Sequence, residues 1–313
     1  MISKPASVMV AGATGFIARA LFRCLETLEI PARALVFTDR KQQKRIPRRA
    51  GLEIHEASST DTASMQQAFR KAAPEIVVNL AAGGVSPDER QPDNLGAGNE
   101  GLLSRLLEAC AKNPPRLFLH AGSWSEYGPA DENALITEDH PVTPTSEYGA
   151  AKAAATHLGS TLAPELGVPM ATLRLFHVFG IGERDYRLIP SLMKGLNAGL
   201  PVDLTPGDQV RDFIYVDDVA DAFAAAWDAA DLEPYQVFNV CSGSPVTVRA
   251  VAENVADAMD KPRDLLNFGA LEKRDDEEPW AVGDNAKFAG ATGWRPRITL
   301  DEGIRRMVAD GGS

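Results

Sequence analysis

The sequence is poor in the features that mark secreted, metal-binding and membrane proteins. Its 313 residues include three cysteines, Cys24, Cys110 and Cys241, which are odd in number and show no metal-ligand spacing. No stretch approaches the roughly 20 apolar residues that a membrane helix needs. The first residues, MISKPASVMVAGATG, lack the long apolar run of a signal peptide. We therefore expect a cytoplasmic protein with reduced, buried thiols and no membrane partner.

Positive charge is also scarce. Lysine and arginine number 32 against 43 aspartates and glutamates, so the formal net charge is −11. A chain this acidic has no general affinity for nucleic acid, and an anionic substrate would need arginines of its own. The acidic run 275–278 has no histidine or cysteine beside it, so we expect a solvated loop and no metal.

Apolar segments that resemble buried strands alternate with helical patterns along the first two thirds of the chain. We expect strands at 7–11, 32–38, 52–57, 75–82, 116–121, 170–176 and 236–240. This alternation predicts an α/β fold, a Rossmann-type doubly wound parallel sheet. After residue 176 we expect irregular chain around Gly180, Gly182, Pro190 and Gly195, then a short strand and a helix capped near Asp217.

Two regions are expected from this pattern. Residues 1–176 plus about 212–243 would form the cofactor-binding domain. Residues about 177–211 plus 244–313 would form a smaller, discontinuous C-terminal substrate lobe.

A glycine-rich turn, GATGFIA, follows the first strand directly and leads into a helical pattern. Gly12 permits the tight turn, and Gly15 lets the backbone approach a pyrophosphate at the positive end of the helix. Ala18 replaces the usual third glycine and is small enough for helix–strand packing. Ligands in such sheets lie at the carboxyl ends of the strands. The expected cofactor contacts are Gly12, Thr14, Gly15, Phe16, Ile17, Leu80, Ala81 and Ala82.

A tyrosine and a lysine stand four residues apart in TSEYGAAKAAATHLGSTLA. Ser146 is a plausible N-cap and the alanines favour a helix, so Tyr148 and Lys152 should share one helix face. An ammonium beside a phenol lowers the pKa of the phenol, which makes a general acid/base near neutral pH. Ser123 follows the fifth strand by two residues and could hydrogen-bond the same substrate oxygen.

With these motifs in place, the chain resembles the extended short-chain dehydrogenase/reductase family, the NAD-dependent epimerases, dehydratases and reductases of nucleotide sugars. GATGFIA resembles the family's cofactor loop, NLAA (79–82) its HLAA, and GSWSEYG (122–128) its SSxxxYG. YGAAK resembles YxxxK, and LRLFHVFG (173–180) resembles LRxxNVYG, with His177 in place of asparagine. RLIPSLMKG, GDQVRDFIYVDDVADA, FNVCSG and GWRPRITLDEGIRRM complete the order. The resemblance covers essentially the whole chain, and the joint occurrence is highly specific.

The resemblance implies that Ser123, Tyr148 and Lys152 form the catalytic triad. Tyr148 would be the general acid/base and Ser123 would polarise the substrate carbonyl. Tyr148 and Lys152 would also contact the cofactor, Lys152 at the nicotinamide ribose. Arginines bind phosphate oxygens bidentately. Residues expected to contact a nucleotide-diphosphate sugar are Trp124, Ser125, His177, Arg187, Arg211 and Arg274.

Three functions share this scaffold. Family dehydratases carry an acid–base pair where Trp124 and Ser125 stand here, so dehydration is not expected, and Glu126, one place further, should be misdirected. GSWSEYG is similar to the GSSEEYG of GDP-4-keto-6-deoxy-mannose reductases. We therefore expect a nucleotide-sugar 4-ketoreductase. A 4-epimerase with tightly bound NAD is the alternative. A non-catalytic NADP-binding regulator is a third hypothesis, which the intact triad opposes.

Cofactor choice depends on where the second strand ends in ALVFTDRKQQK. If it ends at Val36, Arg40 can receive a 2′-phosphate. If it runs one or two residues further, Asp39 takes the place of the acid that binds the ribose and repels a 2′-phosphate. Ser58 stands where many NAD-binding members carry an aspartate for adenine. We favour NADP(H) over NAD(H).

A homodimer is also expected from the resemblance, through the helices at about 99–112 and 146–163. Apolar residues that could face a partner include Leu102, Leu103, Leu106, Leu107, Leu158 and Leu162.

Overall fold

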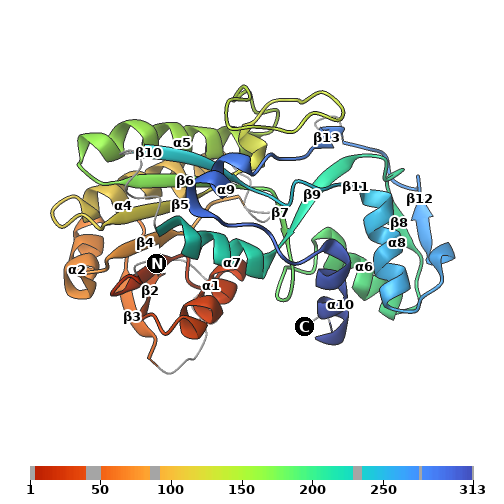
Figure 1. The fold of residues 1–313 in the computed structure, drawn as a ribbon, viewed down its shortest axis with the longest axis horizontal. Helices are drawn as coiled ribbons and strands as arrows, with labels where there is room; N and C mark the ends of the chain where they lie inside the picture. The colour runs from red at the N-terminus through yellow and green to blue at the C-terminus, as the bar shows by residue number, and fades with distance from the viewer. Residues whose placement is uncertain (1–3, 40–50, 85–91, 228–234, 275–276, 312–313) are drawn as a thin grey trace.

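A seven-stranded parallel sheet forms the centre of the larger part of the molecule (Figure 1). This computed structural model describes residues 4–39, 51–84, 92–227, 235–274 and 277–311. The strand order is β10-β6-β5-β4-β1-β2-β3, and each neighbouring pair is parallel. The strands are β1 (Val8–Ala11), β2 (Ala32–Phe37), β3 (Glu53–Ala57), β4 (Ile76–Asn79), β5 (Leu117–Ser123), β6 (Met170–Leu175) and β10 (Tyr235–Val240). The predicted doubly wound sheet is confirmed, and its order reverses between β1 and β4.

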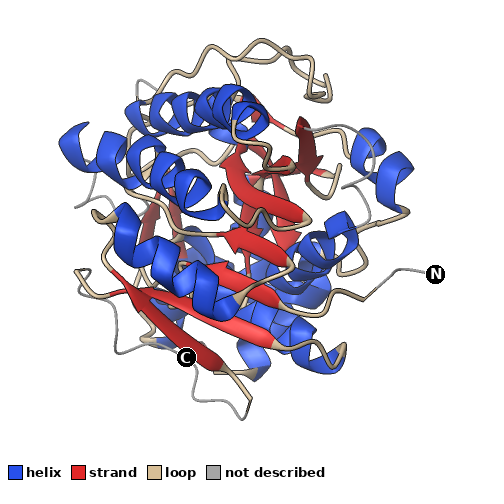
Figure 2. Ribbon diagram, turned by 90° about the vertical axis from the view of Figure 1, so that its left-hand side faces the viewer, coloured by secondary structure: helices blue, strands red, loops and turns tan. Residues whose placement is uncertain are grey.

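Helices cover both faces of this sheet (Figure 2). Along β1, Val8 and Val10 pack into one apolar cluster while Met9 and Ala11 pack into another, as expected for a strand buried on both faces. The first cluster lies under α1 (Phe16–Thr27) and α7 (Val216–Ala225). The second lies under α2 (Thr62–Ala72), α4 (Glu100–Cys110) and α5 (Glu147–Glu165).

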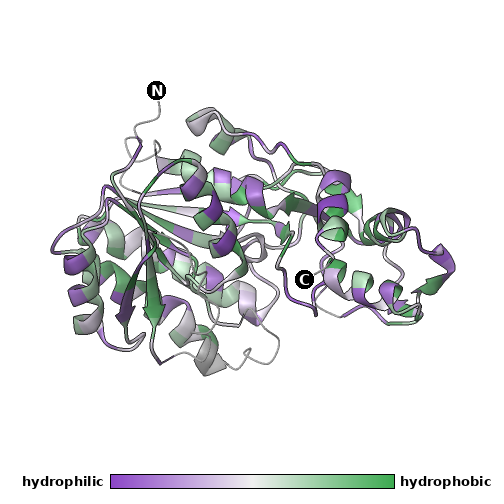
Figure 3. Ribbon diagram, turned by 90° about the horizontal axis from the view of Figure 1, so that it is seen from below, coloured by the Kyte–Doolittle hydropathy of each residue, from purple (hydrophilic) through white to green (hydrophobic). Residues whose placement is uncertain are grey.

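A smaller group of elements lies beside the sheet, to the right in Figure 1 and again in Figure 3. Its strand β9 (Val210–Tyr215) pairs with β7 (His177–Phe179), β11 (Pro245–Thr247) and β13 (Trp280–Ala281). A second ribbon joins β8 (Val202–Leu204) to β12 (Leu266–Phe268). The helices α6 (Leu188–Asn197), α8 (Val248–Ala258), η5 (Arg263–Leu265) and α10 (Leu300–Ala309) belong to this smaller group. The remaining elements pack on the larger part: α3 (Pro92–Gly98) and η3 (Trp124–Glu126) contact α5, and α9 (Ala286–Thr292) contacts β10.

The two-region division remains a prediction, and its boundary between residues 211 and 212 falls inside β9. β9 pairs only with strands of the smaller group among the described residues, whereas α7, which follows it directly, packs on α1. Amphipathic helices alternate hydrophilic and hydrophobic residues in both regions (Figure 3).

Two local expectations were wrong. The chain around Pro190 and Gly195 forms the regular helix α6. Pro190 lies in its first turn, where no intrahelical N–H is needed, and a Cβ at Gly195 would lie 2.4 Å from a Val202 methyl carbon. Helix α7 is not capped by Asp217: Tyr215 is its N-cap, and Asp217 lies in the first turn, paired with Arg23.

The leucines proposed for a dimer interface lie mostly inside the single chain. Fully buried are Leu102, Leu103, Leu106 and Leu107. Leu158 and Leu162 on α5 are half-buried. The first four therefore offer no surface to a partner, and the homodimer stays a prediction that depends on α5. Within the described ranges, no helix combines the length and apolar character that a membrane crossing requires.

Candidate functional site

In the glycine-rich turn between β1 and α1, the neighbouring backbone leaves no room for a side chain at Gly12. Gly12 has φ +78°, and a Cβ there would lie 2.6 Å from the backbone nitrogen of Ala81. Gly15 is the N-cap of α1 and donates its N–H to the Gly12 carbonyl at 3.0 Å. No side chain of the described residues caps α1, so its first N–H groups are available to an anion. This cradle fits a dinucleotide pyrophosphate.

The end of β2 forms the far side of the same cleft. The strand ends at Phe37, one residue beyond Val36, so the premise for favouring NADP(H) was wrong. The Asp39 carboxylate accepts from the Ser59 N–H at 2.9 Å, from the Ser59 hydroxyl at 2.7 Å and from the Ser58 hydroxyl at 3.3 Å. Burial raises the pKa of Asp39, but the hydrogen bonds from Ser59 outweigh it and hold that pKa below its ordinary value.

Not every residue predicted here faces the cleft. Asp39 lines it, together with Ser59 and Thr60 rather than the predicted Ser58. Arg40 lies outside the described residues. Arg105 on α4, which the sequence did not single out, also lines the cleft and donates to the Ser59 carbonyl at 2.8 Å.

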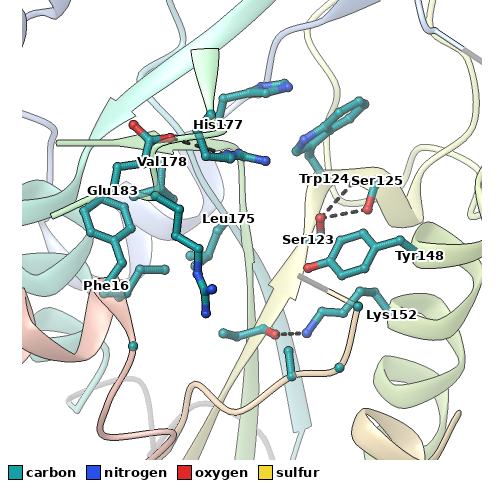
Figure 4. Close-up of a pocket in the computed structure, with 18 of the residues that line it drawn as sticks. Phe16, Ser123, Trp124, Ser125, Tyr148, Lys152, Leu175, His177, Val178 and Glu183 are labelled. Carbon is teal, nitrogen blue, oxygen red and sulfur yellow. Dashed lines mark hydrogen bonds and ion pairs between the residues drawn. The ribbon is translucent and has the colours of Figure 1, made fainter. Parts of the chain in front are cut away.

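Ser123, Tyr148 and Lys152 come together on one wall of the cleft (Figure 4). Tyr148 and Lys152 lie one turn apart on α5, and the predicted N-cap is confirmed: the Ser146 hydroxyl accepts from the Gly149 N–H at 3.1 Å. Ser123 is the last residue of β5 rather than two residues beyond it. Its hydroxyl lies 2.8 Å from that of Ser125.

Lys152 is buried, and its Nζ donates to the Ala121 carbonyl at 2.5 Å. Burial lowers the pKa of Lys152 to about 8, while the Glu126 carboxylate acts in the opposite direction. The ammonium therefore loses its proton within a pH range that an enzyme assay can reach.

The aromatic side chains of Trp124 and His177 lie above Ser123 in the cleft (Figure 4). The Trp124 and His177 rings have centroids 4.8 Å apart, and His177 lies 5.6 Å from Phe213. Burial, and then the charges of Arg211 and Arg187, hold the pKa of His177 well below its ordinary value. His177 is therefore a neutral hydrogen-bonding group at neutral pH.

The predicted substrate arginines, Arg187, Arg211 and Arg274, all line the cleft. Arg211 is mostly buried and pairs with Glu277 at 3.4 Å. The expectation of a solvated acidic loop was wrong for the described part of that run. The Glu277 and Glu278 side chains are largely buried and line the cleft, because Arg211, Gln209 and Thr145 supply partners to their oxygens. Asp275 and Asp276 lie outside the described residues.

Glu183 is a further cleft residue that the sequence did not reveal. It lies with Phe16 and Val178 on the wall opposite Ser123 and Tyr148 (Figure 4). Its side chain is 7% exposed and its Oε1 lies 3.4 Å from Arg187 Nε. Burial raises the pKa of Glu183 to about 7. Among the described residues, no group of His, Cys, Asp and Glu side chains is placed to hold a metal ion.

The cleft measures about 1380 Å³ and is lined by Gly12, Thr14, Gly15, Phe16, Ile17, Leu80, Ala81, Ala82 and the groups above. Sites for drug-sized ligands span roughly 300–1,000 Å³. This cleft is therefore large enough for a dinucleotide and a second ligand together.

Comparison with known proteins agrees with this geometry. The model of the NAD dependent epimerase/dehydratase family matches residues 8–241. The dTDP-6-deoxy-L-talose 4-dehydrogenase (NAD(P)(+)) of Kitasatospora kifunensis is 31% identical over 314 residues, covering 97% of this chain and 95% of that protein. The GDP-6-deoxy-D-mannose reductase of Pseudomonas aeruginosa is 29% identical over 247 residues, covering 76% and 80%.

Among solved structures, the Thermus thermophilus UDP-glucose 4-epimerase in complex with NAD has a TM-score of 0.85 at 27% identity, covering 97% of this chain and 98% of that one. The family match spans most of the chain and includes the glycine-rich turn and the wall of Ser123, Tyr148 and Lys152. The chain therefore belongs to the NAD-dependent epimerase/dehydratase family, the extended short-chain dehydrogenase/reductase type of NAD(P)-dependent enzymes.

Proposed function

We propose that this enzyme is a 4-ketoreductase that reduces a nucleotide-linked 4-keto-6-deoxy sugar. The observation that carries the proposal is the placement of Ser123, Tyr148 and Lys152 on one wall of a cleft with room for two ligands. Two relatives support the substrate class, since both are named for oxidoreduction of a nucleotide-linked 6-deoxy sugar.

The side chains of the cleft then take complementary roles. The nicotinamide cofactor, when bound, supplies the hydride. The Ser123 hydroxyl donates a hydrogen bond to the substrate carbonyl oxygen, and the Tyr148 hydroxyl gives that oxygen its proton. Lys152 holds the ribose and supplies a cation beside Tyr148. A hydride and a proton together convert the ketone to the alcohol.

The substrate end of the cleft suits a nucleotide diphosphate. Arg187, Arg211 and Arg274 line this end, and their planar guanidinium groups suit phosphate oxygens. We propose that an incoming diphosphate displaces Glu277 from Arg211, and that Trp124, Ser125 and His177 surround the sugar.

Dehydration is disfavoured by the residues after Ser123. Trp124 and Ser125 occupy the positions of the dehydratase acid–base pair. Glu126 is 0% exposed and binds the Ser123 N–H and Arg174, which supports the expectation that it is misdirected. The 4-epimerase alternative is favoured by the structural likeness to a UDP-glucose 4-epimerase. A non-catalytic regulator would not need the complete triad, so the presence of all three residues disfavours that hypothesis.

For the cofactor, we now propose a preference for NAD(H). Because β2 runs to Phe37 and Asp39 lines the cleft, the Asp39 carboxylate is positioned to bind the ribose hydroxyls and repel a 2′-phosphate. Tighter binding of NADPH than of NADH by the wild-type protein would contradict this preference.

The test is a ligand panel followed by an assay. Thermal shifts with NADH or NADPH, alone and with GDP, UDP, CDP or dTDP, identify the cofactor and the base. A ligand at about 100 times its dissociation constant stabilises by roughly 2.7 kcal/mol. The matching 4-keto-6-deoxy sugar should then oxidise NADH stoichiometrically. Purified protein that retains NAD and interconverts C4 epimers without net oxidation would establish the epimerase instead.

A further inference from the structure

A buried ion pair lies directly behind the wall of Ser123, Tyr148 and Lys152. Glu126 of η3 is 0% exposed and Arg174 of β6 is 4% exposed. One carboxylate oxygen of Glu126, Oε2, accepts from Arg174 Nε at 2.8 Å, and the other, Oε1, accepts from the Ser123 N–H at 2.7 Å. Neither residue lines the cleft, so neither has a place in the proposed reaction so far.

The surroundings hold this pair in one arrangement. The Arg174 guanidinium stacks over the Tyr127 ring at 4.4 Å, and the Tyr127 hydroxyl donates to Asn239 at 2.7 Å. A Cβ at Gly122 would lie 2.7 Å from Glu126 Oε1, so glycine is needed for the carboxylate to reach the strand. Glu126 and the Ser123 side chain also form a capping box around η3.

Stability alone does not account for a charged pair at this position. Burying two charges costs several kcal/mol, and the net contribution of a buried ion pair is often no better than that of apolar residues of similar volume. A neutral acceptor could also accept from the Ser123 N–H, although more weakly than a carboxylate does. The negative charge of Glu126 therefore calls for another role.

We looked for that role in the effect of the Glu126 charge on Lys152. The titratable and charged groups around its ammonium include Tyr148 on its own helix, His120 on β5, and Glu126 on η3 with its partner Arg174 on β6. Burial holds the pKa of His120 well below its ordinary value, so His120 is neutral.

Lys152 and Glu126 bind β5 two residues apart: Lys152 Nζ donates to the Ala121 carbonyl at 2.5 Å, and Glu126 Oε1 accepts from the Ser123 N–H at 2.7 Å. In agreement with this placement, the Glu126 carboxylate raises the pKa of Lys152, against the effect of burial.

We propose that Glu126, held by Arg174, is a positioning residue for the reaction: it fixes Ser123 at the end of β5 and places a buried negative charge two residues along that strand from the carbonyl that binds Lys152. This inference rests on the proposed roles of Ser123, Tyr148 and Lys152, because Glu126 acts only through those groups.

The test measures the affinity for NADH as a function of pH, with fluorescence as the signal and no sugar present. In wild-type protein the affinity should fall as pH rises through about 8, where Lys152 loses its proton. Glu126→Gln keeps an oxygen for the Ser123 N–H but removes the charge. Loss of a neighbouring opposite charge lowers a lysine pKa by about one unit or more. The midpoint should therefore move down by at least about one pH unit.

Glu75→Gln is the matched control. Glu75 accepts from Arg116 Nε at 2.8 Å, next to the other end of β5, in a half-buried pair of the same geometry. This variant should keep the wild-type midpoint. A merely structural role for Glu126 would lower the melting temperature of Glu126→Gln and leave its midpoint unchanged, which would overturn the proposal.

A double variant, Glu126→Gln with Arg174→Met, covers the case in which the lone Arg174 charge prevents folding. Its midpoint should shift in the same direction but less, because removal of the Arg174 cation offsets part of the loss of the Glu126 charge. A wild-type midpoint in both variants, or failure of both to fold, would overturn the proposal. Because the measurement uses NADH alone, failure to find a sugar substrate would contradict the proposed function and leave this result unaffected.

The contribution to Ser123 is measured separately with the sugar substrate. Glu126→Leu removes the acceptor as well as the charge. It should lower kcat about tenfold or more below Glu126→Gln, as expected for one hydrogen bond, with KM unchanged. Equal kcat values for the two variants would remove Ser123 from the proposal.

Discussion

The two ends of the cleft are lined by different kinds of chemical group. The cofactor end is made largely from backbone and small residues, as in the turn of Gly12 and Gly15 against Ala81. The proposed substrate end is made from charged side chains that pair with one another, such as Arg211 with Glu277 and Arg187 with Glu183. Binding at the first end therefore depends on the shape of the backbone, and binding at the second depends on the balance of charges. A substitution at the cofactor end should abolish binding, whereas one at the proposed substrate end should weaken it by a limited factor.

The largest effect is expected at Gly12. Gly12→Ala forces a side chain into a positive φ and against the Ala81 backbone, which should abolish NADH binding up to about 1 mM. Titration by fluorescence checks this. Gly51 has the same φ, +78°, with no atom near its added Cβ, so Gly51→Ala should keep wild-type binding. Normal NADH affinity in Gly12→Ala would contradict the shape argument.

Tyr148→Phe should have the next largest effect. It removes the hydroxyl that we propose as the proton donor, so turnover should fall about 10²–10⁴-fold while NADH affinity is unchanged. Ser123→Ala should lose less, because one hydrogen bond to the reacting oxygen is removed. Steady-state kinetics and NADH titration separate the two effects. Wild-type turnover in Tyr148→Phe would refute the assigned acid.

Arg211→Ala tests the charged end. Losing a charge-assisted contact costs roughly 1.5–3 kcal/mol, so KM for the nucleotide sugar should rise roughly 10–100-fold with cofactor affinity unchanged. Arg263, an exposed arginine paired with Asp257 and Glu253 away from the cleft, is the control. If Arg211→Ala instead weakened NADH, this arginine would belong to the cofactor end.

Glu183→Gln should have the smallest effect and a stabilising one. The pKa of Glu183 is about 7 in the folded chain and near 4.5 when exposed. Between these values the folded state binds the extra proton, so the free energy of unfolding falls as pH rises from 4.5 to 7. The amide avoids this loss, and the half-exposed Arg187 partner contributes little. At pH 8 the variant should be more stable by on the order of 2 kcal/mol.

Urea unfolding at pH 5 and pH 8 measures the difference. Glu165→Gln, at an exposed position near the end of α5, should unfold like wild type at both pH values. The same stability of Glu183→Gln and wild type at pH 8 would show that Glu183 ionises normally.

The same contrast explains what the sequence could predict. The glycine turn, the pair on α5 and the parallel sheet depend on spacing within one segment, and local spacing is visible in a sequence. Glu126 and Arg174 meet across 48 residues, and Thr145 and Glu278 across 133. No local pattern encodes such encounters, so the acidic run was misjudged and Glu183 and Arg105 were missed.

The expectation of irregular chain after residue 176 was wrong for a related reason. Pro190 and Gly195 break helices when they are considered as residue types, but one stands in a first turn and the other fits against Val202. Their acceptance depends on position and neighbours rather than on composition.

The segment that identifies the family is not a unit of folding. The family match ends at residue 241, yet β9 within it takes its neighbours β11 and β13 from beyond that point. Asp212 on β9 is 0% exposed and accepts hydrogen bonds from Ser242 and Gly243. A fragment cut after residue 241 would expose the edge of β9 that β11 covers and leave a buried carboxylate without its Ser242 and Gly243 donors, and open strand edges template aggregation. Expression fragments and chimeras of this enzyme must therefore carry the C-terminal residues with the cofactor half.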